Sequence, residues 1–276
     1  MKQKVKWYFT VFERALLILF LFAATFPIWL IITNSLKSGV DTFKIPPSIF
    51  FKPVLTNYQQ LFKTTRFGSY FRNSITVAVC TTIIVVMFGT FAAYGIRLFK
   101  SKKVARLSNI LLVGRAVPYI TILIPLYIML NKIGLTGSLI AVIIAHSSST
   151  LPFNTWLISG FMSDVPGELF ESAKIDGCTR MQTLFRIIFP TLKPAIASSA
   201  ILVLQFSWNE LIYAMGFTNM KSYTMTVAVA RYTGGMVVNW GTIGAIACLS
   251  SIPIITVGFF AQKYLISGMT AGAVKG

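Results

Sequence analysis

The chain has 276 residues, of which 55% are apolar and only 12% are charged, and its mean hydropathy is +0.73. This composition excludes an ordinary soluble globular protein. Residues 73–96 and 139–162 are two runs of 24 residues without Asp, Glu, Lys or Arg. Because a helix needs about 20 such residues to cross a hydrocarbon layer of roughly 30 Å, we predict an integral membrane protein.

Six apolar segments are candidate spans, and together they predict an all-α fold. Lysines precede the first, as in a signal peptide, but its apolar run is too long for one and no convincing cleavage site follows. We therefore interpret it as an uncleaved anchor. The predicted spans are residues 15–33, 73–96, 107–130, 139–162, 194–215 and 242–266.

The formal charge of +18 does not come from a clustered, aromatic-interleaved patch of the kind that binds nucleic acid. The basic residues instead follow the positive-inside rule of membrane proteins. With a cytoplasmic N-terminus, the inner segments carry fifteen of them, counting Lys263 near the inner end of the last span, and the outer segments carry nine in about the same length. We therefore predict that both chain ends and residues 97–106 and 163–193 are cytoplasmic, and that residues 34–72 lie outside.

The few acidic residues of the chain are concentrated in the loop at residues 163–193. Three of the seven acidic residues, Glu168, Glu171 and Asp176, lie within nine positions. Ser163 and Asp164 offer capping oxygens before Pro166, which suits a first helical turn. The loop therefore begins with a short predicted helix.

A turn and a second helix are predicted to follow. Gly177 can take the left-handed conformation that closes the first helix. Thr179 and Gln182 have capping-box spacing, and Pro190 is expected to end the second helix. Ser172 and Ala173, beside Gly177, form a small-residue surface that suits docking in a protein groove. The alternative is an amphipathic hairpin on the lipid headgroups.

The same loop resembles a known motif. Glu171-Ser172-Ala173 is followed after three residues by Gly177, and after nine more by Ile187-Ile188-Phe189-Pro190. This is similar to the EAA loop of membrane subunits of binding-protein-dependent ABC importers, with Ser172 and Phe189 as departures from its usual alanine and leucine. The stretches "IPLY", "LPF", "WNE" and "QKYLISGMTAGAVKG" resemble the carbohydrate branch, specifically the second permease of maltose-type importers.

The resemblance implies a type I importer permease in a prokaryotic cytoplasmic membrane, whose loop is a coupling helix seated in a cleft of the ATPase. The implied partners are a second related permease, two ATPase subunits and an extracytoplasmic solute-binding protein. It divides the chain into an anchor and extracytoplasmic segment (1–68), a permease core (69–262) and a cytoplasmic tail (263–276). The implied ATPase-coupling residues are Glu171, Ser172, Ala173, Asp176, Gly177, Ile187 and Pro190.

Catalysis by this chain is not expected. It contains no Gly-Lys dipeptide, so the lysine of a phosphate-binding P-loop has no place. ATP and magnesium are therefore expected in the ATPase partner, and no cofactor in this chain. The single histidine, His146, excludes a multi-histidine metal site, and Cys80, Cys178 and Cys248 are interpreted as structural thiols.

Polar residues in the fifth span are candidates for a substrate pathway. Gln205, Trp208 and Asn209 are spaced to share one helix face. Gln205 lies about 17 Å along the helix from Pro194, near mid-membrane, where polar groups usually face a bundle interior or a water-filled cavity. The set offers a sugar hydroxyl partners and an aromatic face. The alternative is interhelical hydrogen bonding with a packed tryptophan.

Other intramembrane residues leave their roles open. Glu210 is a gate residue, an ion-pair partner of another subunit or an interfacial carboxylate. We favour packing for His146 with the adjacent run 147–150, and snorkelling for Arg115. Gly89, Ala92 and Ala93 are expected to allow close helix packing. The loop at 217–240 either contacts a binding protein or merely connects two spans.

The sequence thus predicts a permease subunit of an ATP-driven importer that carries a sugar of oligosaccharide size by alternating access. An ion-coupled secondary transporter is one alternative, although such proteins usually show internal repeats and intramembrane coupling charges. A non-transporting membrane scaffold is the other.

Overall fold

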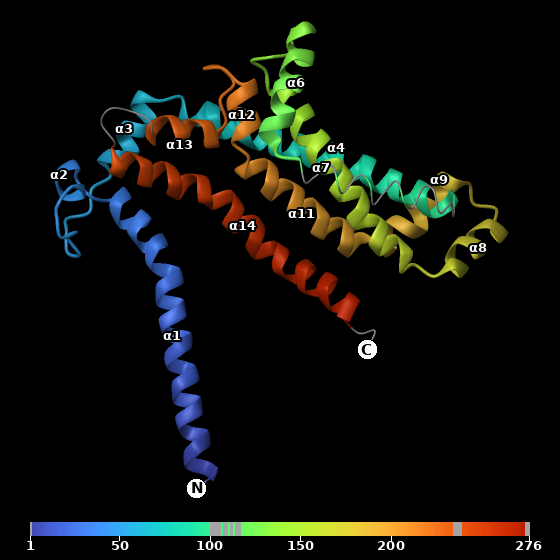
Figure 1. Cartoon of the computed structure of the whole chain (residues 1–276), viewed down its shortest axis with the longest axis horizontal. Coiled ribbons are helices and arrows are strands. Elements are labelled where there is room, and N and C mark those ends of the chain that lie inside the picture. The colour runs from blue at the N-terminus through green and yellow to red at the C-terminus, as the bar shows by residue number, and fades with distance from the viewer. Residues whose placement is uncertain are drawn as a thin grey trace. The chain divides into compact units, whose positions relative to one another are not determined.

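The computed structural model describes residues 2–99, 106, 110, 113, 117–233 and 239–273. Regular structure in these residues is entirely helical, which confirms the predicted all-α class. The chain forms two compact units, one of residues up to 67 with 229–252, the other of 68–228 with residues from 253 onward. The helices, labelled as in Figure 1, are α1 Lys2–Ser35, α2 Gly39–Thr42, α3 Thr56–Thr64, α4 Phe67–Phe99, α6 Tyr119–Lys132, α7 Leu139–Ser163, α8 Gly167–Ile175, α9 Arg180–Thr183, the π-helix η2 Leu184–Ile188, α10 Phe189–Thr191, α11 Lys193–Asn209, α12 Ile212–Phe217, α13 Met225–Thr233 and α14 Trp240–Ala273.

A helix lies at each of the six predicted spans. Within the described residues, three helical stretches are long and apolar enough to cross a membrane: Thr10–Ser35, Phe67–Phe99 and Trp240–Phe260. A fourth candidate is the pair Arg180–Thr191 and Lys193–Asn209, which bends by 80°. α7 has the required length, but polar residues at 146–150 and 154 interrupt its apolar sequence. Of the third span only α6 is described at length, and Arg115 lies outside the described residues.

In the first unit, side chains of α3 hold the end of α1. The amide of Asn57 donates to the carbonyl oxygens of Ser35 and Lys37 at 2.9 and 2.8 Å. Gly244 of α14 lies so close to α1 that a Cβ there would be 2.9 Å from the Ile31 carbonyl oxygen. Residues 43–55 between α2 and α3 contain no helix, and the three prolines in this stretch, Pro46, Pro47 and Pro53, disfavour one.

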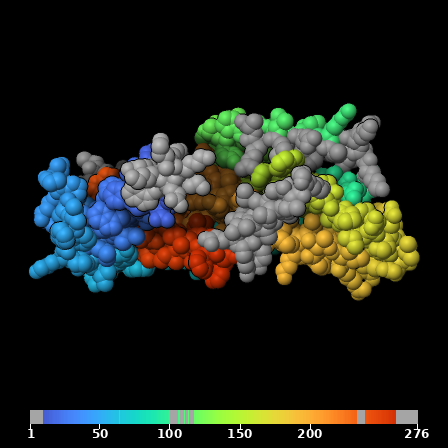
Figure 2. Space-filling model, turned by 90° about the horizontal axis from the view of Figure 1, so that it is seen from below, coloured from blue at the N-terminus to red at the C-terminus, as the bar shows by residue number. Residues whose placement is uncertain are grey.

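In the second unit, α4 and α7 pack tightly at the end that carries the loop at 163–193. Ala93, Ile158 and Met162 are fully buried together with Leu184 and Ile188 of the loop. Gly89 is needed because a Cβ there would overlap the side chain of Asn154. Gly89 and Ala93 therefore pack closely as predicted, whereas Ala92 is exposed. Figure 1 shows α11 running beside α7, and Figure 2 shows the loop (yellow) at the surface beside the residues that follow it.

The fifth span differs from the prediction of one helix over 194–215. α11 ends at Asn209, the two residues Glu210 and Leu211 are not helical, and α12 begins at Ile212. α12 then packs against α6 and α7 through Tyr213 and Phe217, both fully buried. The break is tolerated because the buried carboxylate of Glu210 accepts the backbone N–H groups at the start of α12.

Candidate functional site

The loop at 163–193, from here the EAA loop, is a helix, a tight turn and a second helical segment. α8 ends through Gly177, whose φ is +72°. The N–H of Gly177 donates to the Lys174 carbonyl oxygen at 3.1 Å, and that of Cys178 to the Ala173 carbonyl oxygen at 2.9 Å. These bonds satisfy carbonyls that the helix end would leave unpaired, and glycine adopts the required positive φ at least cost. The predicted turn is confirmed.

The second helical segment starts with the predicted capping box. The N–H of Gln182 donates to Thr179 Oγ1 at 3.3 Å, and the N–H of Thr179 donates to Gln182 Oε1 at 2.8 Å. Two neighbouring bonds thus satisfy donors at the helix start. The segment continues through η2 and α10, and its last residue is Thr191, one beyond Pro190.

The start of the loop corrects one prediction. α7 extends to Ser163 and Asp164 is its C-terminal cap, so neither residue caps α8. Pro166 is itself the N-cap of α8, without a side-chain hydrogen bond. Met162 near the end of α7 and Val165 just beyond it both pack into the core of the second unit.

The predicted ATPase-coupling residues divide by burial. Ala173 is fully buried and Ile187 half-buried. The small-residue surface therefore consists of Ser172 and Gly177, because Ala173 packs inward. The exposed members of the set are Glu171, Ser172, Asp176, Gly177 and Pro190.

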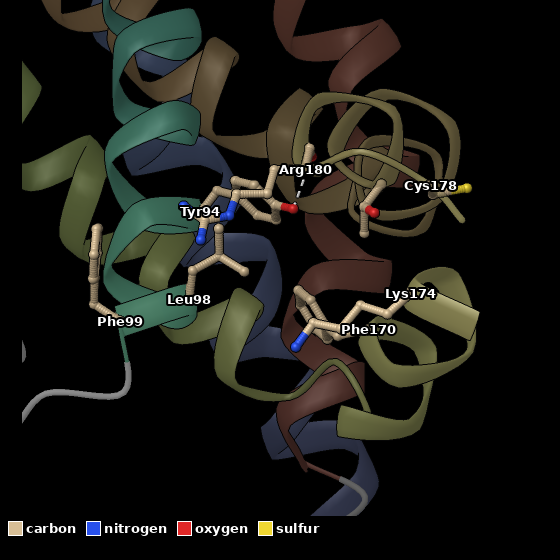
Figure 3. A pocket seen from close by; sticks show the side chains of 8 residues that line it. Tyr94, Leu98, Phe99, Phe170, Lys174, Cys178 and Arg180 are labelled. Atoms are coloured by element: carbon tan, nitrogen blue, oxygen red, sulfur yellow. Dashed lines mark hydrogen bonds between the residues drawn. The ribbon is translucent and has the colours of Figure 1, made fainter. Parts of the chain in front are cut away.

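Two residues of α4, Tyr94 and Arg97, donate hydrogen bonds to the EAA loop. The sequence alone did not indicate this role for either residue. The Tyr94 hydroxyl donates to the Arg180 carbonyl oxygen at 2.9 Å, and the Tyr94 ring stacks on Phe170 with centroids 6.4 Å apart (Figure 3). Arg97 Nη2 donates to the Val165 carbonyl oxygen at 3.2 Å, and its guanidinium lies 5.3 Å from the Phe170 ring centre. α4 therefore contacts both helical halves of the loop. The sequence showed Arg97 only as a sidedness charge.

The three candidate pathway residues of the fifth span, Gln205, Trp208 and Asn209, differ in their exposure to solvent. Gln205 and Asn209 are exposed, and the Asn209 amide donates to the Gln205 carbonyl oxygen at 2.9 Å. Trp208 is only 6% exposed, and its ring meets Phe71 of α4 edge-on at 5.8 Å. Gln205 and Asn209 thus form a polar surface from which Trp208 is turned away.

Glu210 occupies the helix break and is buried, which does not fit one of the three roles left open for it, that of an interfacial carboxylate. Its carboxylate accepts the N–H groups of Tyr213 and Ala214, at 3.0 and 3.2 Å, and so caps α12. Glu210 Oε2 is 2.9 Å from His146 Nε2, and His146 Nδ1 is 2.8 Å from Ser207 Oγ. His146 is itself fully buried, in agreement with its predicted packing role.

Among the described residues, no group of three His, Cys, Asp or Glu side chains could hold a metal ion. The three cysteines are free. The segment at 217–240, for which contact with a binding protein and a simple connection were both left open, contains the helix α13, while residues 234–238 lie outside the described part.

Comparison with known proteins identifies the family. Residues 85–271, which include all of the EAA loop, match the family described as the inner membrane component of binding-protein-dependent transport systems. The chain belongs to this family. It is a multi-pass membrane permease subunit, not an enzyme.

Several curated proteins of this kind match nearly the whole chain. The trehalose/maltose transport system permease protein MalG of Thermococcus litoralis is 32% identical, over 96% of this chain and 98% of its own length. The trehalose transport system permease protein SugB of Mycobacterium tuberculosis is 34% identical, over 92% and 93%. The melibiose/raffinose/stachyose import permease protein MelC of Bacillus subtilis is 30% identical, over 91% of each chain.

Solved structures show the same fold. A chain of a bacterial ABC transporter that imports the acidic polysaccharide alginate matches with a TM-score of 0.80 and 22% identity, covering 93% of this chain and 96% of its own. The family's importer permease architecture is therefore that of this chain.

Proposed function

We propose that this permease is one of two membrane subunits of an ATP-driven importer for a sugar of oligosaccharide size. The relatives named above carry trehalose, maltose, melibiose, raffinose and stachyose according to their names, and a structural neighbour belongs to an alginate importer. The observation that carries the proposal is the EAA loop. It is a capped helix–turn–helix with exposed Glu171, Ser172 and Gly177, fastened to the spanning helix α4.

The proposed assembly contains a second permease, two ATPase subunits and a solute-binding protein outside the cell. One solved neighbour is an alginate transporter in complex with an oligosaccharide-bound periplasmic protein, which supports such a partner. ATP and magnesium are held by the ATPase. In this assembly residues 1–68 anchor the chain and extend outside, residues 69–262 form the permease core, and residues 263–276 are a cytoplasmic tail.

Coupling in this proposal passes from the loop to α4. The exposed side of the loop seats in a cleft of the ATPase, with Glu171, Ser172, Asp176, Gly177 and Pro190 in contact. Ala173 and Ile187 act from the inner side by holding the loop's shape. When the ATPase closes, Tyr94 and Arg97 transmit the displacement to α4, because each bonds a different half of the loop. The spans then reorient around a central pathway.

The pathway is proposed to run along the exposed polar surface of α11. The carboxamides of Gln205 and Asn209 offer donors and acceptors that match sugar hydroxyls. On another side of α11, Trp208 packs against Phe71 and supports this carboxamide surface. The C-terminal end of α11 is fixed by the helix break at Glu210, whose carboxylate caps α12. An aromatic face for the sugar would then come from another residue or from the second permease.

Reconstituted uptake tests the function. The chain with its partners in proteoliposomes should accumulate a labelled disaccharide or trisaccharide only when ATP is inside with the ATPase and the binding protein is outside. Uptake driven by an ion gradient without ATP would identify a secondary transporter instead. Absence of uptake under both conditions, with an intact assembly, would favour the scaffold.

Sidedness is tested in the same preparation with single cysteines in a background lacking Cys80, Cys178 and Cys248. Ile45→Cys reports the segment predicted outside, because Ile45 is 96% exposed. Ser101→Cys reports the segment predicted inside and lies outside the described residues. An impermeant thiol reagent should label the two from opposite faces. Labelling of both from one face would contradict the six-span topology.

A further inference from the structure

A cavity of about 130 Å³ separates the end of α4 from the EAA loop (Figure 3). A single water needs only about 10–15 Å³ of such space, so the cavity has room for a group as large as a phosphate. The side chains that line it are Tyr94, Leu98 and Phe99 of α4, Phe170 and Lys174 of α8, and Cys178, Arg180 and Thr183.

The charge of this cavity is positive and unbalanced. Lys174 and Arg180 reach into it from the loop (Figure 3), and its lining among the described residues contains no carboxylate. Among the described residues, neither Lys174 nor Arg180 forms an ion pair with a carboxylate; the pairs Lys44–Asp41 and His146–Glu210 lie elsewhere. Arg97 does not compensate them, because it is also a cation. A lysine and an arginine around one small cavity are the side chains that bind phosphate oxygens best.

The opposite wall of the cavity is apolar. Leu98 and Phe99 are the last residues of the membrane-spanning helix α4, and the Phe99 side chain is 69% exposed. The Phe170 ring, held by Tyr94 and Arg97, forms a further part of the wall. Basic pockets at the end of a spanning helix lie at the depth of phospholipid phosphates.

We propose that this cavity binds a phosphate group, supplied either by an anionic lipid headgroup or by a soluble phosphate ester. The phosphate oxygens accept hydrogen bonds from Lys174 and Arg180, and the glycerol portion lies against Leu98 and Phe170. A bound phosphate bridges the loop and α4 beside the contacts of Tyr94 and Arg97. The inference rests on the proposed function only in placing the EAA loop at the membrane surface.

Native mass spectrometry of the purified, delipidated assembly tests binding without any transport assay. The probes are phosphatidylglycerol, phosphatidylcholine and glycerol 3-phosphate, each added separately. The test variant is Lys174→Gln with Arg180→Gln. The matched control is Arg186→Gln with Lys193→Gln, which removes the same charge from exposed residues of the loop that do not line the cavity.

We expect the test variant to lose phosphatidylglycerol or glycerol 3-phosphate binding by roughly tenfold or more, because two charge-assisted bonds are removed. The control should bind like the unmodified chain, and phosphatidylcholine should not respond to either change. Loss confined to the lipid would assign the headgroup, and loss with glycerol 3-phosphate also would assign a soluble ester. Equal binding by the test and control variants overturns the proposal.

A second measurement leaves Lys174 and Arg180 unchanged. It therefore tests the proposal even if the double variant fails to assemble. Cys178 is half-buried and lines the cavity. In a chain with Cys80→Ser and Cys248→Ser, alkylation of Cys178 by neutral N-ethylmaleimide should slow several-fold when the ligand that binds is present. A cysteine at exposed Ser163, with Cys178→Ser, should react at an unchanged rate. If neither phosphatidylglycerol nor glycerol 3-phosphate slows the alkylation of Cys178, the proposal is also overturned. Uptake measured in parallel shows separately whether transport itself has failed.

Discussion

Tyr94→Phe tests whether α4 receives the motion of the EAA loop. The change removes one oxygen, which donates to the Arg180 carbonyl at 2.9 Å, and leaves the ring that stacks on Phe170. A hydrogen bond of this kind contributes about 0.5–1.5 kcal/mol net. The attached state of the loop should therefore be weakened by about two- to twelvefold.

A weaker attachment has a specific consequence for transport. The ATPase can still close on the loop, since the exposed coupling residues are unchanged, but α4 follows less often. We expect uptake to fall while ATP hydrolysis continues, so that the ATP consumed per sugar imported rises by up to the same factor, about two- to twelvefold. The measurement is initial-rate uptake and phosphate release in the same proteoliposomes.

Tyr127→Phe is the matched control. It removes the same atom from a ring that stacks on Phe217, with centroids 6.1 Å apart, in a different part of the second unit. This variant should keep the ratio of ATP to sugar unchanged. If Tyr94→Phe also leaves the ratio unchanged, or lowers uptake and hydrolysis in equal proportion, the contact is packing only and the coupling argument is refuted.

Three further predictions concern the loop and the fifth span. Gly177→Val should cost about 1 kcal/mol or more through its positive φ alone, since a Cβ there meets nothing within 4 Å, and the ATPase should copurify poorly from a chain that still inserts; normal copurification and uptake would remove the docking claim. Trp208→Ala should lower the melting temperature, because it leaves a cavity that costs about 3–5 kcal/mol. The relative uptake rates of two sugars should stay unchanged. An altered sugar preference at an unchanged melting temperature would instead indicate that Trp208 contacts the sugar. Glu210→Ala should destabilise the chain by roughly 3 kcal/mol, because His146 and two backbone donors lose a buried acceptor, and a double-mutant cycle with His146→Ala should show coupling; strict additivity would disprove the proposed network.

Features that depend on residues close together in the chain could be predicted from the sequence. Apolar runs of spanning length predicted the helical membrane class, because a backbone in hydrocarbon must bond to itself. Gly177, Thr179 and Gln182 predicted the turn and the capping box, because these motifs join residues three to five positions apart. The EAA spacing led to the family for the same reason: it is written in one continuous stretch.

Contacts between side chains that are far apart in the sequence could be seen only in the folded chain. Tyr94 bonds a carbonyl 86 positions away, and His146 meets Glu210 across 64 positions. No pattern of neighbouring residues predicts contacts between such distant positions. The fifth span was therefore predicted as unbroken, and the role of Glu210 stayed open between a gate residue, an ion-pair partner and an interfacial carboxylate. Burial was equally nonlocal: Ala173 packs inward beside exposed Ser172, and Trp208 turns from Gln205 and Asn209. Which face of a helix is covered depends on the helices that pack against it, and these come from distant parts of the sequence.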